Sequence, residues 1–149
     1  MRAVIQRTKG SKVVVDHKTC GEICSGLMVL LGIKRGDTEK EAQYMMDKII
    51  NLRIFPDDEG KMNCSLLDIG GEILLVSQFT LYGDARKGRR PGFSQAALPE
   101  EAMALYQYSI DYLKNRGLRV ATGVFGAEML VKIDNDGPVT ILLDSEKLF

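Results

Sequence analysis

The segment "SQFTL", Ser77 to Leu81, closes an apolar stretch with groups that could act on a substrate. Ser77, Gln78 and Thr80 supply hydroxyls, an amide and backbone N–H groups where a predicted strand leaves its sheet. Strand ends are rigid and accessible, so they suit catalytic or binding residues. Because polar residues at strand ends are usually structural, this segment alone defines a candidate site and no specific chemistry.

A second candidate is "NDGPVT", Asn135 to Thr140, in which Gly137 precedes Pro138 between two apolar stretches. The ordinary interpretation is a hairpin turn with proline at the first position of the next strand. A cis Gly–Pro bond, found at about 5–6% of such positions, would instead fix the flanking carbonyls in an unusual direction. Fixed carbonyls are good acceptors for an ammonium group, but the sequence leaves the isomer open.

The third candidate is a loop with four cations in five residues: Arg86, Lys87, Arg89 and Arg90. Arginine forks match phosphate oxygens, so the loop is a candidate phosphate-binding surface. A solvated charged loop is the alternative. Tyr82 and Phe93 flank the loop and could stack on a base or belong to the core.

The histidine and cysteines offer little chemistry. His17, Cys20 and Cys24 could in principle be metal ligands, but their spacing fits no common zinc pattern and no fourth ligand is near in sequence. His17 is the only histidine, and we expect it in an exposed turn, where it would not activate a nucleophile. Three cysteines form no disulfide framework, which favours reduced thiols in a cytosol. We expect no metal and no cofactor.

These candidates must be held by predicted strands and helices. Alternating or β-branched residues predict strands at "RAVIQRT", "KVVVD", a third segment after "HKTCG", "LMVLLGI", "EILLVSQFTL", "RVATGVF", "EMLVKID" and "PVTILLD". The last two are expected to form a hairpin through "NDG". The segment "FPDDEGKMN" is expected to be an acidic turn.

Two helices are predicted. Thr38 and Glu41 fit a capping box at the start of the first, whose apolar stripe is Ala42, Met45, Met46, Ile49 and Ile50. The second begins near Pro99 and ends at Gly117. Its inward residues are expected to be Met103, Tyr106, Ile110 and Leu113.

The whole pattern predicts one α+β domain over residues 1–149, with a mainly antiparallel sheet or barrel and the two helices packed outside. Twenty basic and twenty acidic residues cancel, so any binding of a polyanion must come from a local patch. The longest apolar run, "GLMVLLGI", is far shorter than the ~20 residues that span a bilayer. We therefore expect a soluble, cytoplasmic protein.

The motifs "SQFTLYGD", "KGRRPGF" and "NDGPVT", in this order, resemble those of the D-aminoacyl-tRNA deacylases, also called D-Tyr-tRNA(Tyr) deacylases. The resemblance covers essentially the whole chain, from "MRAVIQR" to "TGVFGAEMLVKIDNDGPVTILLDS". The stretch "SKVVVDHKTCGEI" is a looser match, and Gly92 stands where the family has a polar residue. Neither difference touches the two signature segments.

The resemblance implies a homodimer that hydrolyses the ester between a D-amino acid and the terminal ribose of a tRNA, and also glycine esters. It implies a pocket formed by Ser77, Gln78, Phe79 and Thr80 of one chain. The Gly137–Pro138 pair of the other chain, in cis, would read chirality, and Arg7 would brace its loop. Arg86, Lys87, Arg89 and Arg90 would contact the phosphates of the tRNA.

The expected chemistry agrees with these residues. Since the α-ammonium group already activates an aminoacyl ester, backbone N–H groups near Phe79 and Thr80 could suffice to hold the oxyanion. Thr80 is expected to position water rather than attack, because no residue in view would deprotonate its hydroxyl. Two alternatives remain: a non-catalytic tRNA-binding module, or a small-ester hydrolase with Thr80 as nucleophile.

Overall fold

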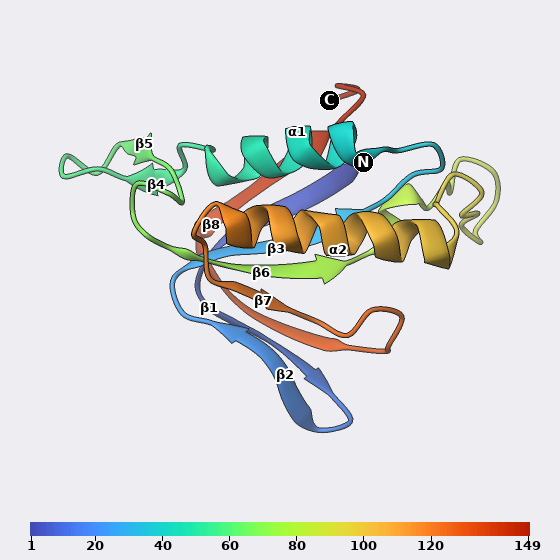
Figure 1. Cartoon of the computed structure of the whole chain (residues 1–149), viewed down its shortest axis with the longest axis horizontal. Coiled ribbons are helices and arrows are strands. Elements are labelled where there is room, and N and C mark those ends of the chain that lie inside the picture. The colour runs from blue at the N-terminus through green and yellow to red at the C-terminus, as the bar shows by residue number, and fades with distance from the viewer.

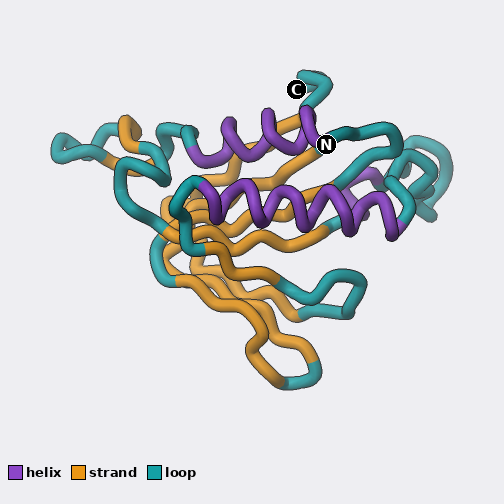
Figure 2. Tube along the Cα trace, viewed as in Figure 1, coloured by secondary structure: helices purple, strands orange, loops and turns teal.

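The computed structural model describes all residues from Met1 to Phe149, as one curved six-stranded sheet with two helices on one side and a separate two-stranded sheet (Figures 1 and 2). The helices are α1 (Glu39–Ile50), α2 (Pro99–Asn115) and a short 3-10 helix, η1 (Phe79–Tyr82). The strands are β1 (Arg2–Val15), β2 (Lys18–Ile23), β3 (Gly26–Gly32), β4 (Phe55–Pro56), β5 (Met62–Cys64), β6 (Glu72–Ser77), β7 (Val120–Thr122) and β8 (Leu130–Asp144). The predicted α+β class, with both helices outside the sheet, is confirmed.

Strand β1 is the axis of the sheet. It pairs with β8 on one side, and on the other with β3 along its first half and with β2 along its second half, always antiparallel. The sequence predicts two strands in each of the regions that form β1 and β8, and this prediction is wrong. Each is one long strand, because its two halves pair with the same neighbour and not with each other.

The remaining strands of this sheet are parallel, and the sheet curls so that β7, at one edge, approaches β2, at the other edge. β6 lies parallel to β3, and β7 lies parallel to β6. At the curl, a Cβ added to Gly21 of β2 would lie 2.1 Å from the carbonyl oxygen of Thr122 in β7. Because Gly21 has no Cβ, β2 can approach β7 this closely, and the sheet forms a nearly closed barrel.

The helices confirm most of the local predictions. Thr38 and Glu41 form the capping box of α1, and the hydrogen bond from Thr38 lowers the pKa of Glu41. The predicted apolar stripe of α1 is buried, both methionines included. In α2, Met103 is wrongly predicted: it is 48% exposed, because it lies on the outer side of the first two turns while Tyr106 faces the sheet.

The core has two parts. The larger lies between the helices and one face of the sheet, and the smaller lies inside the curl, where it consists of Val13, Ile23, Met28, Leu74 and Val76. Strands β3 and β6 have buried residues on both faces, which explains their nearly continuous apolar sequences. Neither α1 nor α2 has the length and apolar character that a helix needs to cross a bilayer.

Candidate active site

The segment "SQFTL" lies where β6 ends and the chain turns into η1. Ser77 is the last residue of β6 and pairs with Leu31 of β3, whose carbonyl accepts the N–H of Gln78 at 2.8 Å. The buried strand thus fixes the first residue of the turn. The side chains that follow are accessible, and Phe79 is 57% exposed.

The turn presents unused donors. Phe79 and Thr80 are the first two residues of η1, so their N–H groups have no carbonyl one turn earlier within the helix. The Thr80 hydroxyl accepts a hydrogen bond from the Gln78 side-chain amide. An amide donor holds a hydroxyl in place but takes no proton from it. The turn therefore offers two backbone donors and a fixed, neutral hydroxyl.

A cavity of about 620 Å³ opens beside this turn. Its walls come from the end of β6, the start of α2, and the segment between β7 and β8, and 13 of its 18 lining residues are hydrophobic. Ser77, Gln78, Phe79, Leu98, Phe125 and Met129 are among them. Sequence reasoning missed Phe125 and Met129 and placed Phe125 in a strand, although the paired glycines at 123 and 126 signal that this strand ends early.

The segment "NDGPVT" is a bulge in the middle of β8 and not a hairpin turn. Gln6 of β1 pairs with Thr140 and Thr8 pairs with Asn135, so β8 has three extra residues opposite this part of β1. Gly137 and Pro138 are exposed on the bulge, and the peptide bond between them is cis. Gly137 has φ of +123°, a conformation that other residues rarely adopt.

Arg7 of β1 contacts the base of this bulge. Its Nε lies 3.3 Å from the carbonyl oxygen of Asp136 and 3.1 Å from the Asp136 carboxylate. Its Nη1 donates to the carbonyl oxygen of Ile54 at 2.6 Å. One guanidinium thereby joins the bulge to the chain segment after α1, and its side chain is only 12% exposed.

Within one chain, the bulge and the η1 turn lie far apart. Ser77 is level with Leu31 and Ala3, whereas the bulge leaves β8 near Arg7. Four residues of strand separate these levels, about 13 Å, and β8 and β6 are three strand spacings of about 4.8 Å apart. The structure therefore does not bring these two groups of candidate residues together within a single chain.

The cationic loop follows η1 and is closed at its base. Asp84 and Gly92 exchange two backbone hydrogen bonds of 2.7 and 2.9 Å. The Asp84 carboxylate also accepts from the backbone and side chain of Arg86, and the side-chain hydrogen bond holds the pKa of this carboxyl well below its usual range. One of the four predicted cations is thus already paired.

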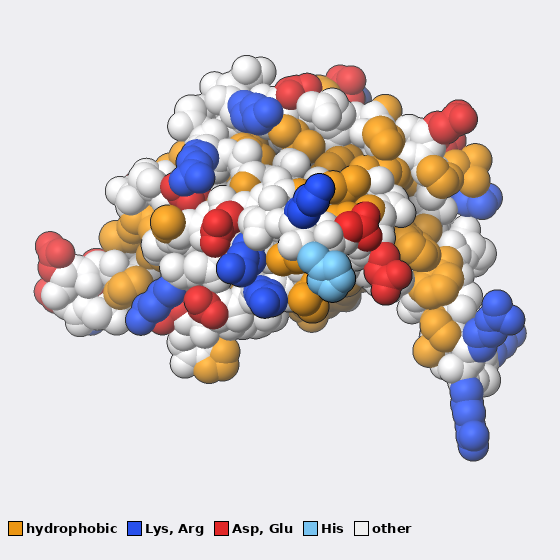
Figure 3. Space-filling view, turned by 90° about the horizontal axis from the view of Figure 1, so that it is seen from below, with side chains coloured by type: hydrophobic (Ala, Val, Ile, Leu, Met, Phe, Trp, Pro, Cys, Tyr) orange, Lys and Arg blue, Asp and Glu red, His pale blue; other side chains and the backbone are white.

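The other three cations, Lys87, Arg89 and Arg90, are exposed and have no carboxylate partner. Figure 3 shows Lys and Arg side chains gathered on a projection from the body of the molecule. At the end of the loop, the Phe93 ring meets the Phe79 ring edge to face, with centroids 5.1 Å apart. The charged loop is therefore continuous with the η1 turn and the cavity.

His17 lies in the exposed turn between β1 and β2, as predicted, at the opposite end of β1 from η1. Cys20 and Cys24 are exposed on and just after β2, and Cys64 is half-buried in β5. All three thiols are free. None of these side chains lines the cavity.

Comparison with known proteins gives a consistent result. The family model described as D-Tyr-tRNA(Tyr) deacylase matches residues 4–144. Proteins named D-aminoacyl-tRNA deacylase from Syntrophomonas wolfei and Clostridioides difficile are 69% and 60% identical over 149 residues, which cover all of both chains.

Two solved structures are also similar. A structure described as c-Myc DNA Unwinding Element Binding Protein matches with a TM-score of 0.91 and 43% identity, covering 97% of this chain and 98% of the other. A probable eukaryotic D-amino acid tRNA deacylase matches with a TM-score of 0.80 at 21% identity, covering 95% and 97%, and this likeness concerns the fold.

Proposed function

Because this chain belongs to the D-Tyr-tRNA(Tyr) deacylase family, we propose that Ser77–Thr80 of one chain and Gly137–Pro138 of a second copy form its active site. The reaction is that of the family: the chain hydrolyses the ester bond of D-aminoacyl-tRNA and so proofreads chirality. The observation that carries the composite site is the separation of the two groups of residues within one chain.

The η1 turn supplies the electrostatic part of catalysis. Water attacks the ester carbonyl, whose oxygen becomes negative, and the N–H groups of Phe79 and Thr80 are free to receive it. One donor of this kind contributes about 3–4 kcal/mol to transition-state stabilisation. The apolar walls of the cavity strengthen the effect, because they lower the dielectric constant around the developing charge.

Thr80 positions the attacking water and is not itself the nucleophile. Its hydroxyl oxygen is occupied by the Gln78 amide, and no base stands beside it to remove the proton. Nearby Tyr82 is neutral, because burial raises the pKa of its phenol above the usual value. When the C–O bond to the ribose breaks, the departing ribose oxygen takes the proton that the attacking water loses, relayed by the adjacent 2′-hydroxyl or by solvent, and the amino acid leaves with a new carboxyl group.

A second copy brings Gly137 and Pro138 to the turn. The open face of β1 and β8 carries exposed Leu142 opposite half-exposed Val4, between the η1 end and the bulge. Apolar side chains on an open sheet face favour packing against another sheet. A symmetric pair of chains would bury this face twice and place each bulge over the other chain's turn.

The bulge selects D-amino acids by shape. Its main-chain carbonyls hold the α-ammonium group while the η1 donors hold the ester carbonyl, which fixes the directions of the two remaining substituents. A D side chain points to open space, whereas an L side chain meets the backbone of Gly137 and Pro138. Glycine has no side chain, so glycyl-tRNA is also a substrate.

Lys87, Arg89 and Arg90 hold the phosphates next to the ester. The patch is local on a chain without net charge, so binding is modest and the product leaves readily. Such a substrate places the protein in the cytoplasm, where tRNA is charged. No cofactor takes part.

The substrate test uses D-Tyr-tRNA, L-Tyr-tRNA and a simple D-amino ester, with release of amino acid as the measurement. We expect rapid cleavage of the first only. Equal cleavage of both enantiomers would contradict the chirality filter, and binding without cleavage would identify a docking module. Turnover of the free ester with little salt dependence would identify a small-ester hydrolase.

Thr80→Ala should retain measurable deacylation, and its complete inactivity in folded protein would make Thr80 the nucleophile.

Mixed dimers test the composite site. Phe79→Pro removes one donor and Gly137→Val obstructs the filter, so each homodimer should be nearly inactive. Refolding the two together should restore about a quarter of wild-type activity, because half of the dimers then carry one intact site of two. No recovery in dimers of proven mixed composition would place both segments in the same chain's site. His17→Asn mixed with wild type is the neutral control.

A further inference from the structure

Arg2, the first residue of β1, connects three elements beside the proposed oxyanion donors. Its Nε donates to Asp144 Oδ2 of β8 at 2.9 Å, and its Nη1 donates to the carbonyl oxygen of Leu81 in η1 at 3.2 Å. Arg2 and Asp144 are also direct partners in the β1–β8 register. One guanidinium therefore ties two strands to the turn that carries Phe79 and Thr80.

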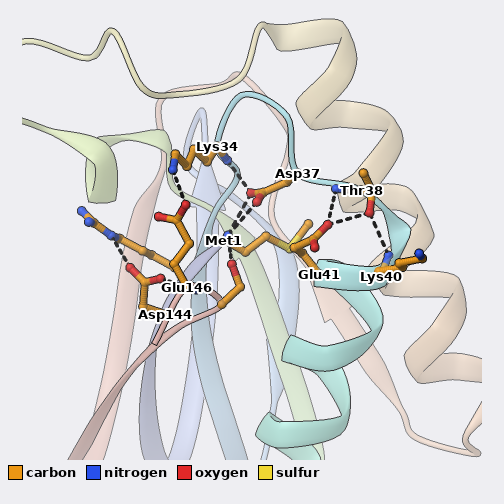
Figure 4. Close-up of polar contacts among 10 residues, drawn as sticks. Met1, Lys34, Asp37, Thr38, Lys40, Glu41, Asp144 and Glu146 are labelled. Carbon is orange, nitrogen blue, oxygen red and sulfur yellow. Dashed lines mark hydrogen bonds and ion pairs between the residues drawn. The ribbon is translucent and has the colours of Figure 1, made fainter. Parts of the chain in front are cut away.

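The partners of Arg2 are themselves held firmly. Asp144 is only 4% exposed, and its second oxygen accepts the N–H of Glu146 at 2.7 Å. Figure 4 shows Asp144 and Glu146 close to Met1, at one end of the sheet. The guanidinium also lies 4.8 Å from the ring centroid of Tyr82, which is 3% exposed. The Arg2 side chain is 27% exposed, but its carboxylate partner is buried, and its two donors bind two different acceptors, Asp144 and the Leu81 carbonyl.

These contacts argue against the simplest alternative, that Arg2 binds a phosphate of the tRNA. Its charge is matched by a buried carboxylate and its face is covered by an aromatic ring. Lys87, Arg89 and Arg90, in contrast, are exposed and have no carboxylate partner. Arg2 therefore adds little to the attraction between the protein and its substrate.

We infer that Arg2 is a positioning residue for deacylation: by holding the Leu81 carbonyl, it fixes the η1 turn so that the Phe79 and Thr80 N–H groups point at the developing oxyanion. This inference rests on the proposed site. Leu81 directly follows Thr80, and the Thr80 carbonyl accepts the N–H of Gly83 at 2.9 Å. A short helix of four residues has few bonds of its own, so an outside anchor sets its orientation.

The test compares Arg2→Ala and Arg2→Lys with wild type in deacylation of D-Tyr-tRNA. A displacement of about 1 Å at a reacting centre can cost about 100-fold, so we expect kcat to fall between about tenfold and 100-fold in Arg2→Ala. KM and the salt dependence of tRNA binding should not change. Arg2→Lys should recover little, because one ammonium group cannot replace the two-pronged contact of the guanidinium.

Arg119→Ala is the matched control. Arg119 forms an ion pair with Glu72 at the start of β6, the end away from η1, and its loss should leave kcat unchanged. Amide exchange at Gly83 should become faster in the Arg2 variants and not in the control, which reports loosening of the turn itself. Thermal unfolding identifies any variant that does not fold, and Arg2→Lys decides the matter if Arg2→Ala is lost.

Wild-type kcat in folded Arg2→Lys and Arg2→Ala would overturn the inference. A raised KM with unchanged kcat would overturn it as well, because it would make Arg2 a tRNA-binding residue. Failure of the wild-type protein to cleave D-Tyr-tRNA would instead contradict the proposed function, and the two failures are therefore distinguishable.

Discussion

The two ends of the part of β1 that pairs with β3 each hold one half of the proposed site, and they do so differently. At one end, Arg2 joins buried Asp144 to a turn that offers N–H donors. At the other, Arg7 joins the half-exposed Asp136 to a bulge that offers main-chain surface and carbonyls. The same residue type thus supports charge stabilisation at one end and shape recognition at the other.

The two arginines also point to opposite faces of the strand. Side chains alternate along a strand, so Arg2 lies on the face of Val4 and Gln6, which are half-exposed. Arg7 lies on the face of Ala3 and Ile5, which are buried under the helices. Because one strand directs the two half-sites away from each other, a second copy is the natural way to combine them.

The largest expected effect is at the η1 end. Phe79→Pro removes one oxyanion donor at the first position of η1, where proline is tolerated, and kcat should fall by about 10²–10³. Single-turnover deacylation of D-Tyr-tRNA measures the effect. Phe79→Leu keeps the N–H and an apolar side chain, so it should retain most of the activity. Equal losses in both variants would assign the effect to the ring and not to the donor.

At the bulge, Gly137→Ala should damage selectivity more than rate. The new Cβ would lie 2.9 Å from Val139 Cγ2 and 3.1 Å from Arg7 Nη2, at a φ that costs about 1–3 kcal/mol. The bulge must shift, and the preference for D-Tyr-tRNA over L-Tyr-tRNA should fall about tenfold. Gly60→Ala is the control, because Gly60 also has positive φ but a Cβ there would meet nothing within 4 Å. An unchanged enantiomer ratio in Gly137→Ala would remove the bulge from chirality recognition.

The cationic loop adjoins the η1 turn and not the bulge. The salt dependence of tRNA binding tests whether the tRNA phosphates are held at the η1 side. Replacing Lys87, Arg89 and Arg90 by alanine should reduce the slope of log affinity against log salt by about 2, at about 0.7 for each contact with a single strand. Arg86→Ala should change the slope much less, since Asp84 already neutralises Arg86. Filter binding to tRNA between low and moderate salt measures both. Equal slopes for the wild type, the triple variant and Arg86→Ala would place the tRNA elsewhere.

The smallest effect concerns pH. The Asp84 carboxyl has a pKa below its usual value in the folded loop, so its pairing with Arg86 is fully present above about pH 4 and is lost as pH falls through the depressed pKa. NMR titration of the carboxyl carbon should show this low pKa in wild type. Arg86→Gln should move the pKa back toward its usual value. An ordinary pKa in the wild-type protein would mean that Asp84 and Arg86 are not paired in solution.

Local signals explain what the sequence predicted correctly. The capping box of α1, its buried stripe and the exposed turn at His17 depend on residues a few positions apart, so they could be read directly. The hairpin predicted at "NDGPVT" was wrong because both halves of β8 pair with β1, which lies more than a hundred residues earlier. A turn signal does not reveal which strand is the neighbour.

Some residues of the candidate site were predicted from the sequence and others were missed. The four residues of "SQFT" and the Gly–Pro pair stand out by type, and the resemblance linked them. Arg2 was missed because its partner Asp144 is remote in sequence and neither residue is unusual where it stands. Phe125 and Met129 were missed as cavity residues, because apolar residues near a strand look the same whether they fill a core or line a hollow.

Arg2 and Arg7 are an odd number of positions apart, which places them on opposite faces of β1. This spacing limits which insertions and deletions the gene for such a protein can accept. A deletion or insertion of one residue between them would turn one arginine to the wrong face and detach either the turn or the bulge. A change of two residues would keep both faces but alter the span between the two half-sites by about 7 Å. The loops of this chain can vary in length, whereas these few positions are expected to tolerate substitutions only.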